Sequence, residues 1–270
     1  MPTTRRDDAE LYWESTGAGA PVLLVMGLGM NATGWWRTIP VLAQRLRVIA
    51  FDNRGVGRSS RPPGPYSVPQ LAGDAVAVLD AAGVDRAHVY GISLGGMIAQ
   101  EIALQHPDRV DALVLGATTP GGPSAVVADD ETLAFFRRRG EMPAEEAVWA
   151  SVPYNYGPRT RAEHADRIGQ DIAQRLRFPI EPGPYKAQLD AGLGHDAHDR
   201  LPQIDHPTLI VHGDQDRMVS PTNAQLIAAE IPGADLMILP GAGHLYPTDE
   251  PQADPAILRF LSERSSPGPS

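Results

Sequence analysis

Residues 88–96 read His88-Val-Tyr-Gly-Ile-Ser-Leu-Gly-Gly96, and this stretch decides the fold more than any other in the chain. An apolar run of strand length enters the pentapeptide Gly91-Ile-Ser93-Leu-Gly95, and a helix-like run as far as His106 leaves it. A serine that attacks a carbonyl must stand clear of its backbone, on a sharp turn between a strand and a helix. The flanking glycines leave room for that turn, since a Cβ there would crowd the neighbouring strand or helix. We therefore predict that Ser93 is a nucleophile.

The helix that follows Ser93 is expected to point its N-terminus at the serine. The backbone N–H of Leu94 and the helix dipole would then receive the negative charge that develops on an attacked carbonyl. A G-x-S-x-G pentapeptide occurs by chance in roughly one chain in ten of this length. The prediction therefore depends on the strand–helix context, and on a base and an acid elsewhere in the chain.

His244 and Asp216 are the candidate base and acid, and each follows an apolar run at the expected end of a strand. A serine hydroxyl is a poor nucleophile, so it needs an imidazole to take its proton and a carboxylate to orient that imidazole. Asp214 competes with Asp216 because it is closer to its strand, where it could instead cap the turn. The remaining histidines are expected at surface or packing positions: His88, His106, His164, His195, His198, His206 and His212.

The composition excludes several other classes of protein. The 270 residues carry a net charge of −10, which argues against binding to nucleic-acid phosphates and to anionic membranes. No run approaches about 18 apolar residues, and the N-terminus lacks the apolar stretch of a signal peptide. The absence of cysteine removes disulfides, thiolate nucleophiles and cysteine-ligated zinc. We expect a cytoplasmic protein that binds no nucleic acid and no membrane, and nothing in the sequence points to a particular oligomeric state.

Apolar runs of strand length alternate with helical segments along most of the chain. The strands are expected at residues 22–26, 48–51, 89–92, 112–115, 208–211 and 236–239, with an antiparallel edge strand at 11–15. The helices are expected at residues 35–46, 68–82, 94–106, 221–230 and 251–263. Continuous apolar runs are typical of parallel strands covered on both faces, so the pattern predicts an α/β fold with a doubly wound, mostly parallel sheet. Ligands of such sheets bind beyond the carboxyl ends of the strands, where Ser93, Asp216 and His244 fall.

The alternation breaks between residues 119 and 203. Helical pieces without a clear strand are expected there, at residues 130–139, 143–151, 159–178 and 185–193. We predict a helical cap at 119–203, inserted into a core formed by 1–118 and 204–263, and a disordered tail at 264–270. The large aromatic residues of the cap either line a pocket over the serine or hold the cap together: Phe135, Phe136, Trp149, Tyr154, Tyr156, Phe178 and Tyr185.

From about Leu11 to Leu261 the chain resembles the α/β-hydrolase superfamily. Four motifs carry the resemblance: Val25-Met-Gly-Leu-Gly29, Asp52-Asn-Arg-Gly-Val-Gly-Arg-Ser59, the serine turn, and the Asp216/His244 pair. Within the superfamily the chain is similar to small esterases and lactonases with helical caps, of the aclacinomycin methylesterase and 3-oxoadipate enol-lactonase types. The second motif is more typical of a structural turn than of a chemical site.

The resemblance implies a triad of Ser93, Asp216 and His244, which follow one another in the order of α/β-hydrolases. In the family the acid stands three residues after a glycine, here Gly213, which favours Asp216 over Asp214.

A second oxyanion donor is also implied by the resemblance, namely the backbone N–H of Leu28. Most relatives carry His-Gly in this loop, whereas this chain has Met26-Gly27. Since the donor is a backbone amide, the exchange should spare the oxyanion hole and alter only how the loop is braced.

We expect a carboxylic-ester hydrolase, an esterase or a lactonase, that acts on a small to medium apolar acyl substrate through an acyl-enzyme. A cofactor-free perhydrolase of the haloperoxidase type and a noncatalytic binding protein of the same fold stay open as alternatives. Dehalogenases and epoxide hydrolases are disfavoured, because they carry an aspartate where this chain has Ser93. Neither a cofactor nor a metal is expected, since no cluster of His, Cys and carboxylates has ligand spacing. The expected substrate contacts are Gly27, Trp35, Trp149, Tyr154 and Tyr246.

Overall fold

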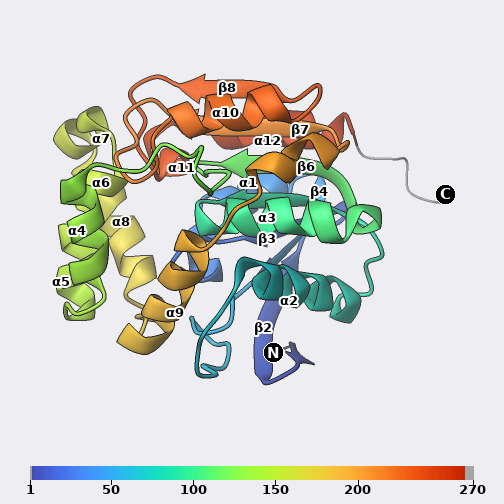
Figure 1. Ribbon diagram of the computed structural model, residues 1–270, viewed down its shortest axis with the longest axis horizontal. Coiled ribbons are helices and arrows are strands. Elements are labelled where there is room, and N and C mark those ends of the chain that lie inside the picture. Colours follow the sequence, from blue (N-terminus) through green and yellow to red (C-terminus); the bar gives the residue numbers. More distant parts are fainter. Residues whose placement is uncertain (1, 265–270) are drawn as a thin grey trace.

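A central sheet of eight strands organises the computed structural model, which describes residues 2–264 (Figure 1). The strands lie in the order β1-β2-β4-β3-β5-β6-β7-β8. β2 pairs antiparallel with β1 and β4, and every other pairing is parallel. Their bounds are Thr3–Arg6 (β1), Ala9–Thr16 (β2), Ala20–Val25 (β3), Leu46–Phe51 (β4), Ala87–Ile92 (β5), Val110–Gly116 (β6), Thr208–Gly213 (β7) and Asp235–Leu239 (β8).

Helices cover both faces of the sheet, which explains why the strands are apolar without alternation. Along β3, Leu23 and Val25 pack on one face, and Val22 and Leu24 pack on the other. The first face is covered by α2 (Val68–Ala81), α3 (Leu94–Gln105) and α10 (Thr222–Glu230), and the second by α1 (Thr38–Leu42) and α12 (Ala253–Ser262) (Figure 1). Shorter helical turns are η1 (Ala32–Trp35), η2 (Pro107–Arg109), η3 (His198–Gln203) and α11 (Tyr246–Asp249). The doubly wound, mostly parallel α/β fold is thereby confirmed.

The segment between β6 and β7 is helical. It contains α4 (Asp130–Arg139), α5 (Ala144–Ala150), α6 (Val152–Asn155), α7 (Pro158–Glu163), α8 (Ala165–Arg175) and α9 (Pro182–Leu193). Helices α4 to α8 lie together beyond one end of the sheet, and α9 lies between them and the core (Figure 1). Residues 119–203 are called the cap segment below. No helix among residues 2–264 is both long enough and apolar enough to cross a bilayer.

Two expected elements differ from the structure. The strand at residues 11–15 is not at the edge, because β1 pairs with β2 outside it. The single helix at 35–46 is wrong: the chain forms the turn η1 and then the short α1. Asn31 starts η1 by accepting the Thr33 N–H, and Asp52 accepts the N–H of Ala32, so the first helical turn begins before residue 35. At the other end α1 stops at Leu42, because Leu46 already pairs in the sheet as the first residue of β4. The helix at 159–178 is divided at His164 into α7 and α8. Of the tail at 264–270, residues 265–270 lie outside the described residues.

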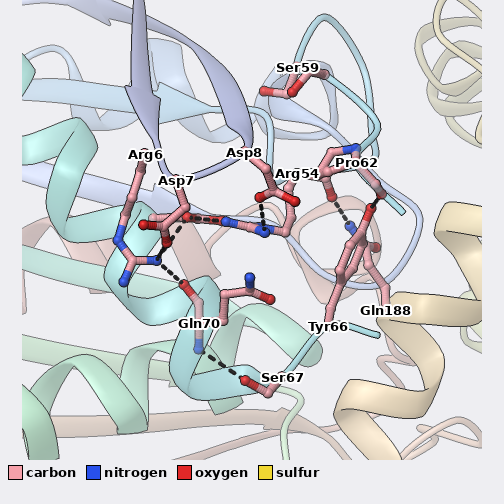
Figure 2. A network of polar contacts seen from close by, with 12 residues as sticks. Arg6, Asp7, Asp8, Arg54, Ser59, Pro62, Tyr66, Ser67, Gln70 and Gln188 are labelled. Carbon is pink, nitrogen blue, oxygen red and sulfur yellow. Dashed lines mark hydrogen bonds and ion pairs between the residues drawn. The ribbon is translucent and has the colours of Figure 1, made fainter. Parts of the chain in front are cut away.

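The segment from Asp52 to Ser59 forms a turn held by buried ion pairs. Arg54 binds Asp74 of α2 through two bonds, Nε to Oδ2 at 2.6 Å and Nη2 to Oδ1 at 2.8 Å. Its Nη1 also reaches Asp8 at 3.1 Å, which ties the turn to the N-terminal strands (Figure 2). Asp52 accepts the backbone N–H of Arg58 and pairs with its guanidinium. These contacts make the segment a brace between sheet and helix.

Asp254 of α12 is a buried carboxyl that makes stability depend on pH. Burial raises the pKa of Asp254 to about 6, although the hydroxyl of Thr38 donates to it and opposes the shift. The unfolded chain releases this proton near pH 4 and the folded chain near pH 6, so stability is lost as the pH rises between them. The loss should amount to about 3 kcal/mol at pH 7.

We therefore expect Asp254→Asn to gain stability relative to wild type as the pH rises from 4 to 7. The measurement is urea unfolding of both proteins across this range, with the exposed Asp85→Asn as the control. A difference between Asp254→Asn and wild type that stays constant with pH would contradict the assignment.

Candidate active site

Ser93 lies in a strained turn between β5 and α3. Its backbone has φ 59° and ψ −122°, a conformation that side-chain-bearing residues rarely adopt. The two glycines are required by close contacts: a Cβ at Gly91 would lie 2.0 Å from the Gly95 carbonyl oxygen, and one at Gly95 would lie 2.0 Å from the Val25 carbonyl oxygen. Among the described residues the Ser93 hydroxyl makes no hydrogen bond. In apo structures a serine–histidine contact is often long, and tightens when substrate binds.

Two backbone amides flank the serine from different loops. Leu94 is the first residue of α3, so its N–H has no partner within the helix. Leu28 follows Gly27, whose Cβ position would lie 3.0 Å from the Cβ of Ser93. Within residues 2–264, neither the Leu28 nor the Leu94 amide donates a hydrogen bond. Neither amide is therefore engaged by another group of the described residues.

The loop that carries Leu28 is braced from the cap segment. Gln188 of α9 is fully buried and accepts the N–H of Gly29 at 3.0 Å. Its amide nitrogen donates to the Arg54 carbonyl oxygen at 3.0 Å, beside Tyr66 (Figure 2). Sequence reasoning missed this residue, because nothing in the sequence marks one helical glutamine as buried.

His244 and Asp216 meet after β8 and β7. The Nδ1 of His244 lies 2.7 Å from Oδ2 of Asp216. Oδ1 of Asp216 accepts the backbone N–H groups of Met218 at 2.8 Å and Val219 at 3.0 Å. Burial alone would raise the pKa of Asp216, but the charge of His244 and the hydrogen bonds from His212 and His244 outweigh it and lower the pKa to about 2. The carboxylate is therefore ionised and fixed in orientation.

Asp214, the alternative acid, lies elsewhere. Its Oδ1 accepts the N–H of Gly241 at 2.7 Å, so it braces the loop after β8, and its side chain is exposed. The structure thus brings Asp216, and not Asp214, to His244.

His212 is a second histidine at the acid. It lies at the end of β7, four residues before Asp216, and is fully buried. Its Nε2 is 3.0 Å from Oδ2 of Asp216 and 3.0 Å from the Val219 carbonyl oxygen. Both partners are acceptors, so Nε2 carries the proton. His212 occupies a buried packing position, as expected, and it also contacts the acid, which the sequence analysis did not foresee. The i, i+4 spacing to Asp216 was the available signal.

A cavity of about 210 Å³ opens onto these groups. Ser93, His244, Gly27, Leu28 and Leu94 all line it. The remaining wall is mainly apolar and comes from both the core and the cap segment, including Met26, Met30, Met97, Leu133, Phe136, Met218 and Val219. Two buried arginines of the cap segment, Arg139 and Arg175, also line it. Among the described residues no group of three or more His, Cys, Asp and Glu side chains could hold a metal ion.

Four of the five expected substrate contacts do not line this cavity, and only Gly27 does. Trp35 is fully buried and packs on Tyr90, with ring centroids 4.8 Å apart. The hydroxyl of Tyr246 is bonded to that of Tyr90 at 2.8 Å, inside the core. These two aromatics fill the face of the sheet covered by α1 and α12.

The aromatics of the cap segment mainly hold it together. Tyr154 stacks on Phe135 at 4.3 Å and donates to Glu131. Trp149 is 52% exposed and does not line the cavity. Of the seven large aromatics expected either to line a pocket or to support the cap, Phe136 alone lines the cavity.

The sheet order, the strained serine and the histidine–aspartate pair define an α/β hydrolase. The sequence model of the alpha/beta hydrolase fold family matches residues 20–251. The chain therefore belongs to the α/β-hydrolase family, and its relatives support hydrolase activity.

Similar proteins cover nearly the whole chain. It is 33% identical, over 97% of this chain and 99% of the relative, to a candidate carbamate hydrolase, RutD, of Azorhizobium caulinodans. It is 35% identical, over 90% of this chain and 84% of the relative, to poly(3-hydroxyalkanoate) depolymerase of Ectopseudomonas oleovorans. A thermophilic esterase of Thermogutta terrifontis has a similar structure, with a TM-score of 0.84, 28% identity, and 98% of both chains covered.

Proposed function

We propose that the protein cleaves a carboxylic ester or a lactone through Ser93, His244 and Asp216, with a covalent acyl-enzyme. The observation that carries the proposal is the strained Ser93 at an apolar cavity that it shares with His244, whose Nδ1 is bound to a buried carboxylate. A backbone strain of this kind is retained where it serves a function, because it costs about 1–3 kcal/mol.

The first half of the reaction acylates Ser93. Because Nδ1 of His244 donates to Asp216, the neutral imidazole carries its lone pair on Nε2. That nitrogen takes the proton of Ser93 as Oγ bonds to the carbonyl carbon. The carbonyl oxygen becomes an oxyanion, which the N–H groups of Leu28 and Leu94 would bind. When the C–O bond to the leaving group breaks, the imidazolium returns the proton to the departing alkoxide, and the alcohol is released.

The second half hydrolyses the acyl-enzyme. Nε2 of His244 takes a proton from water while the water oxygen attacks the acyl carbon. The bond to Oγ then breaks, and the proton returns to Ser93, which leaves the free carboxylic acid. Asp216 stays ionised throughout, consistent with its lowered pKa of about 2.

Oxygen esters suit this site better than amides. An amine is a poorer leaving group than an alkoxide and must be protonated as the C–N bond breaks, a task that falls to the imidazolium of His244. Tyr246, the nearest other donor in sequence, has its hydroxyl bonded to that of Tyr90 within the core. The relatives include an esterase and a depolymerase, which favours ester-type substrates. The candidate carbamate hydrolase among the relatives makes a carbamate the necessary comparison in the assay.

The test is a substrate panel measured with the wild-type protein and Ser93→Ala. It contains p-nitrophenyl esters, aliphatic and aryl lactones, a matched anilide, a p-nitrophenyl carbamate, and peracid formation with hydrogen peroxide. We expect kcat/KM for the preferred ester or lactone to exceed kcat/KM for the amide, the carbamate and perhydrolysis by roughly tenfold or more. Tenfold corresponds to about 1.4 kcal/mol of transition-state binding. A preference for the amide, the carbamate or peroxide would overturn the ester assignment. An absence of any turnover, with an unreactive Ser93, would favour a binding protein.

A further inference from the structure

Two arginines of the cap segment lie in the wall of the Ser93 cavity. Arg139 is the last residue of α4 and Arg175 the last residue of α8, and both side chains line the cavity. Each residue is only 8% exposed. Their neighbours Arg138 and Arg177 are exposed, as arginines at helix ends usually are.

Neither buried arginine has an acidic partner among residues 2–264. Arg139 forms no ion pair, and its guanidinium lies 5.2 Å from the ring centre of Tyr185. Arg175 donates to the hydroxyl of Ser151 at 3.2 Å, which is a neutral partner. Burial, together with the charge of Arg139, lowers the pKa of Arg175 to about 10.

The nearby carboxylate of Asp171 is already engaged. Its Oδ1 accepts from the Nε of Arg37 and from the indole of Trp36, each at 3.0 Å. Its Oδ2 accepts from the hydroxyls of Tyr156 and Thr248. Asp171 attracts Arg175 at longer range, but it leaves no oxygen for an ion pair with that side chain.

Arg54 shows how this protein otherwise buries a guanidinium. That side chain is also almost fully buried, and it binds Asp74 through two short bonds and Asp8 through a third (Figure 2). A buried charge without such a partner is costly, and two like charges in one apolar cavity cost more. A bound anion would remove that cost, since the planar guanidinium binds a carboxylate through two parallel hydrogen bonds.

We infer that the substrate carries a carboxylate, held by Arg139 and Arg175, at the far end of an apolar linker from the carbonyl that Ser93 attacks. The inference rests on the proposed function and narrows it to half-esters of dicarboxylic acids and to lactones that bear a carboxylate. The apolar wall supplied by the methionine and leucine side chains fits the linker. An acyl group with a terminal carboxylate takes the place of the purely apolar acyl group that the sequence led us to expect.

A matched pair of substrates tests the inference on the whole protein. One is p-nitrophenyl hydrogen adipate, which has a free carboxylate. The other is methyl p-nitrophenyl adipate, in which that carboxylate is replaced by a neutral methyl ester. We expect the wild-type protein to prefer the half-ester in kcat/KM by about 10- to 100-fold, mainly through KM. In Arg139→Met and Arg175→Met this ratio should fall by at least about tenfold, and Arg→Lys at each position should restore part of it. The exposed Arg138→Met and Arg177→Met are the controls and should keep the wild-type ratio.

Binding of adipate, followed by calorimetry, gives a readout that needs no turnover. It should be detectable in the wild-type protein and weakened at least about tenfold in Arg139→Met and Arg175→Met. Turnover of both esters with no preference, or a preference that survives both Met variants, would overturn the carboxylate site while the hydrolase assignment stands. No turnover of either ester would instead count against the proposed function. In that case adipate binding that depends on the arginines would still support the anion site, and its absence would overturn it.

Discussion

Replacing Ser93 by alanine is expected to lower kcat by on the order of 10⁴-fold or more while the protein stays folded. Without Oγ no acyl-enzyme forms, so His244 and Asp216 have no nucleophile to activate. The fold should survive, because alanine is no larger than serine at this strained position and Ser93 makes no side-chain hydrogen bond among the described residues. The measurement is the initial rate on the preferred ester, with a thermal melt of each protein.

A fluorophosphonate probe identifies the reactive serine directly. It should label the wild-type protein at Ser93 and fail to label Ser93→Ala. Ser67→Ala is the matched control, because Ser67 caps α2 by accepting the N–H of Gln70 and lies on the surface. That variant should lose about 1 kcal/mol of stability and keep its kcat. Labelling at another serine would show that the nucleophile is misassigned.

The central sheet was predictable because its strands are buried on both faces. Continuous apolar runs such as those of β3 and β6 can be recognised without knowledge of their neighbours. β1 was missed for the opposite reason: Thr3-Thr-Arg-Arg6 contains no apolar residue. It is held by pairing with β2 and by Arg6, which binds the Gln70 carbonyl oxygen and Asp74 of α2. Contacts of this long range leave no local pattern.

The candidate catalytic residues could be predicted because their chemistry fixes residue types and strand ends. The cavity wall could not. An aromatic residue fills a core as readily as a pocket, so Trp35 and Tyr246 could equally have pointed to either face of the sheet. Arg139 and Arg175 look like ordinary charged residues at helix ends, and only the packing of the cap segment buries them. Positions of this kind depend on how helices dock, which composition and periodicity do not specify.

The substitution Asp216→Asn is expected to lower kcat by roughly 10³- to 10⁴-fold, because asparagine offers a donor where His244 needs an acceptor. If the asparagine oxygen accepts the N–H groups of Met218 and Val219, the asparagine NH₂ group faces Nδ1 of His244. The imidazole would then carry its proton on Nε2, and could not take one from Ser93. With the amide flipped, the nitrogen would instead face two backbone N–H groups. The first orientation also sets the new amide nitrogen against the Nε2–H of His212, so both orientations create a donor–donor contact. Asp216→Asn should therefore also lower the melting temperature.

Asp214→Asn separates the loss of catalysis from the loss of stability. The oxygen of asparagine can still accept the Gly241 N–H, so this variant should keep its fold and most of its activity. Rates are compared well below both melting temperatures, and circular dichroism reports the folded fraction. A large loss in Asp214→Asn with little loss in Asp216→Asn would move the acid to Asp214. Equal losses in two folded proteins would contradict the geometry, since only Asp216 reaches His244, and it does so with Oδ2 shared by a second histidine, His212.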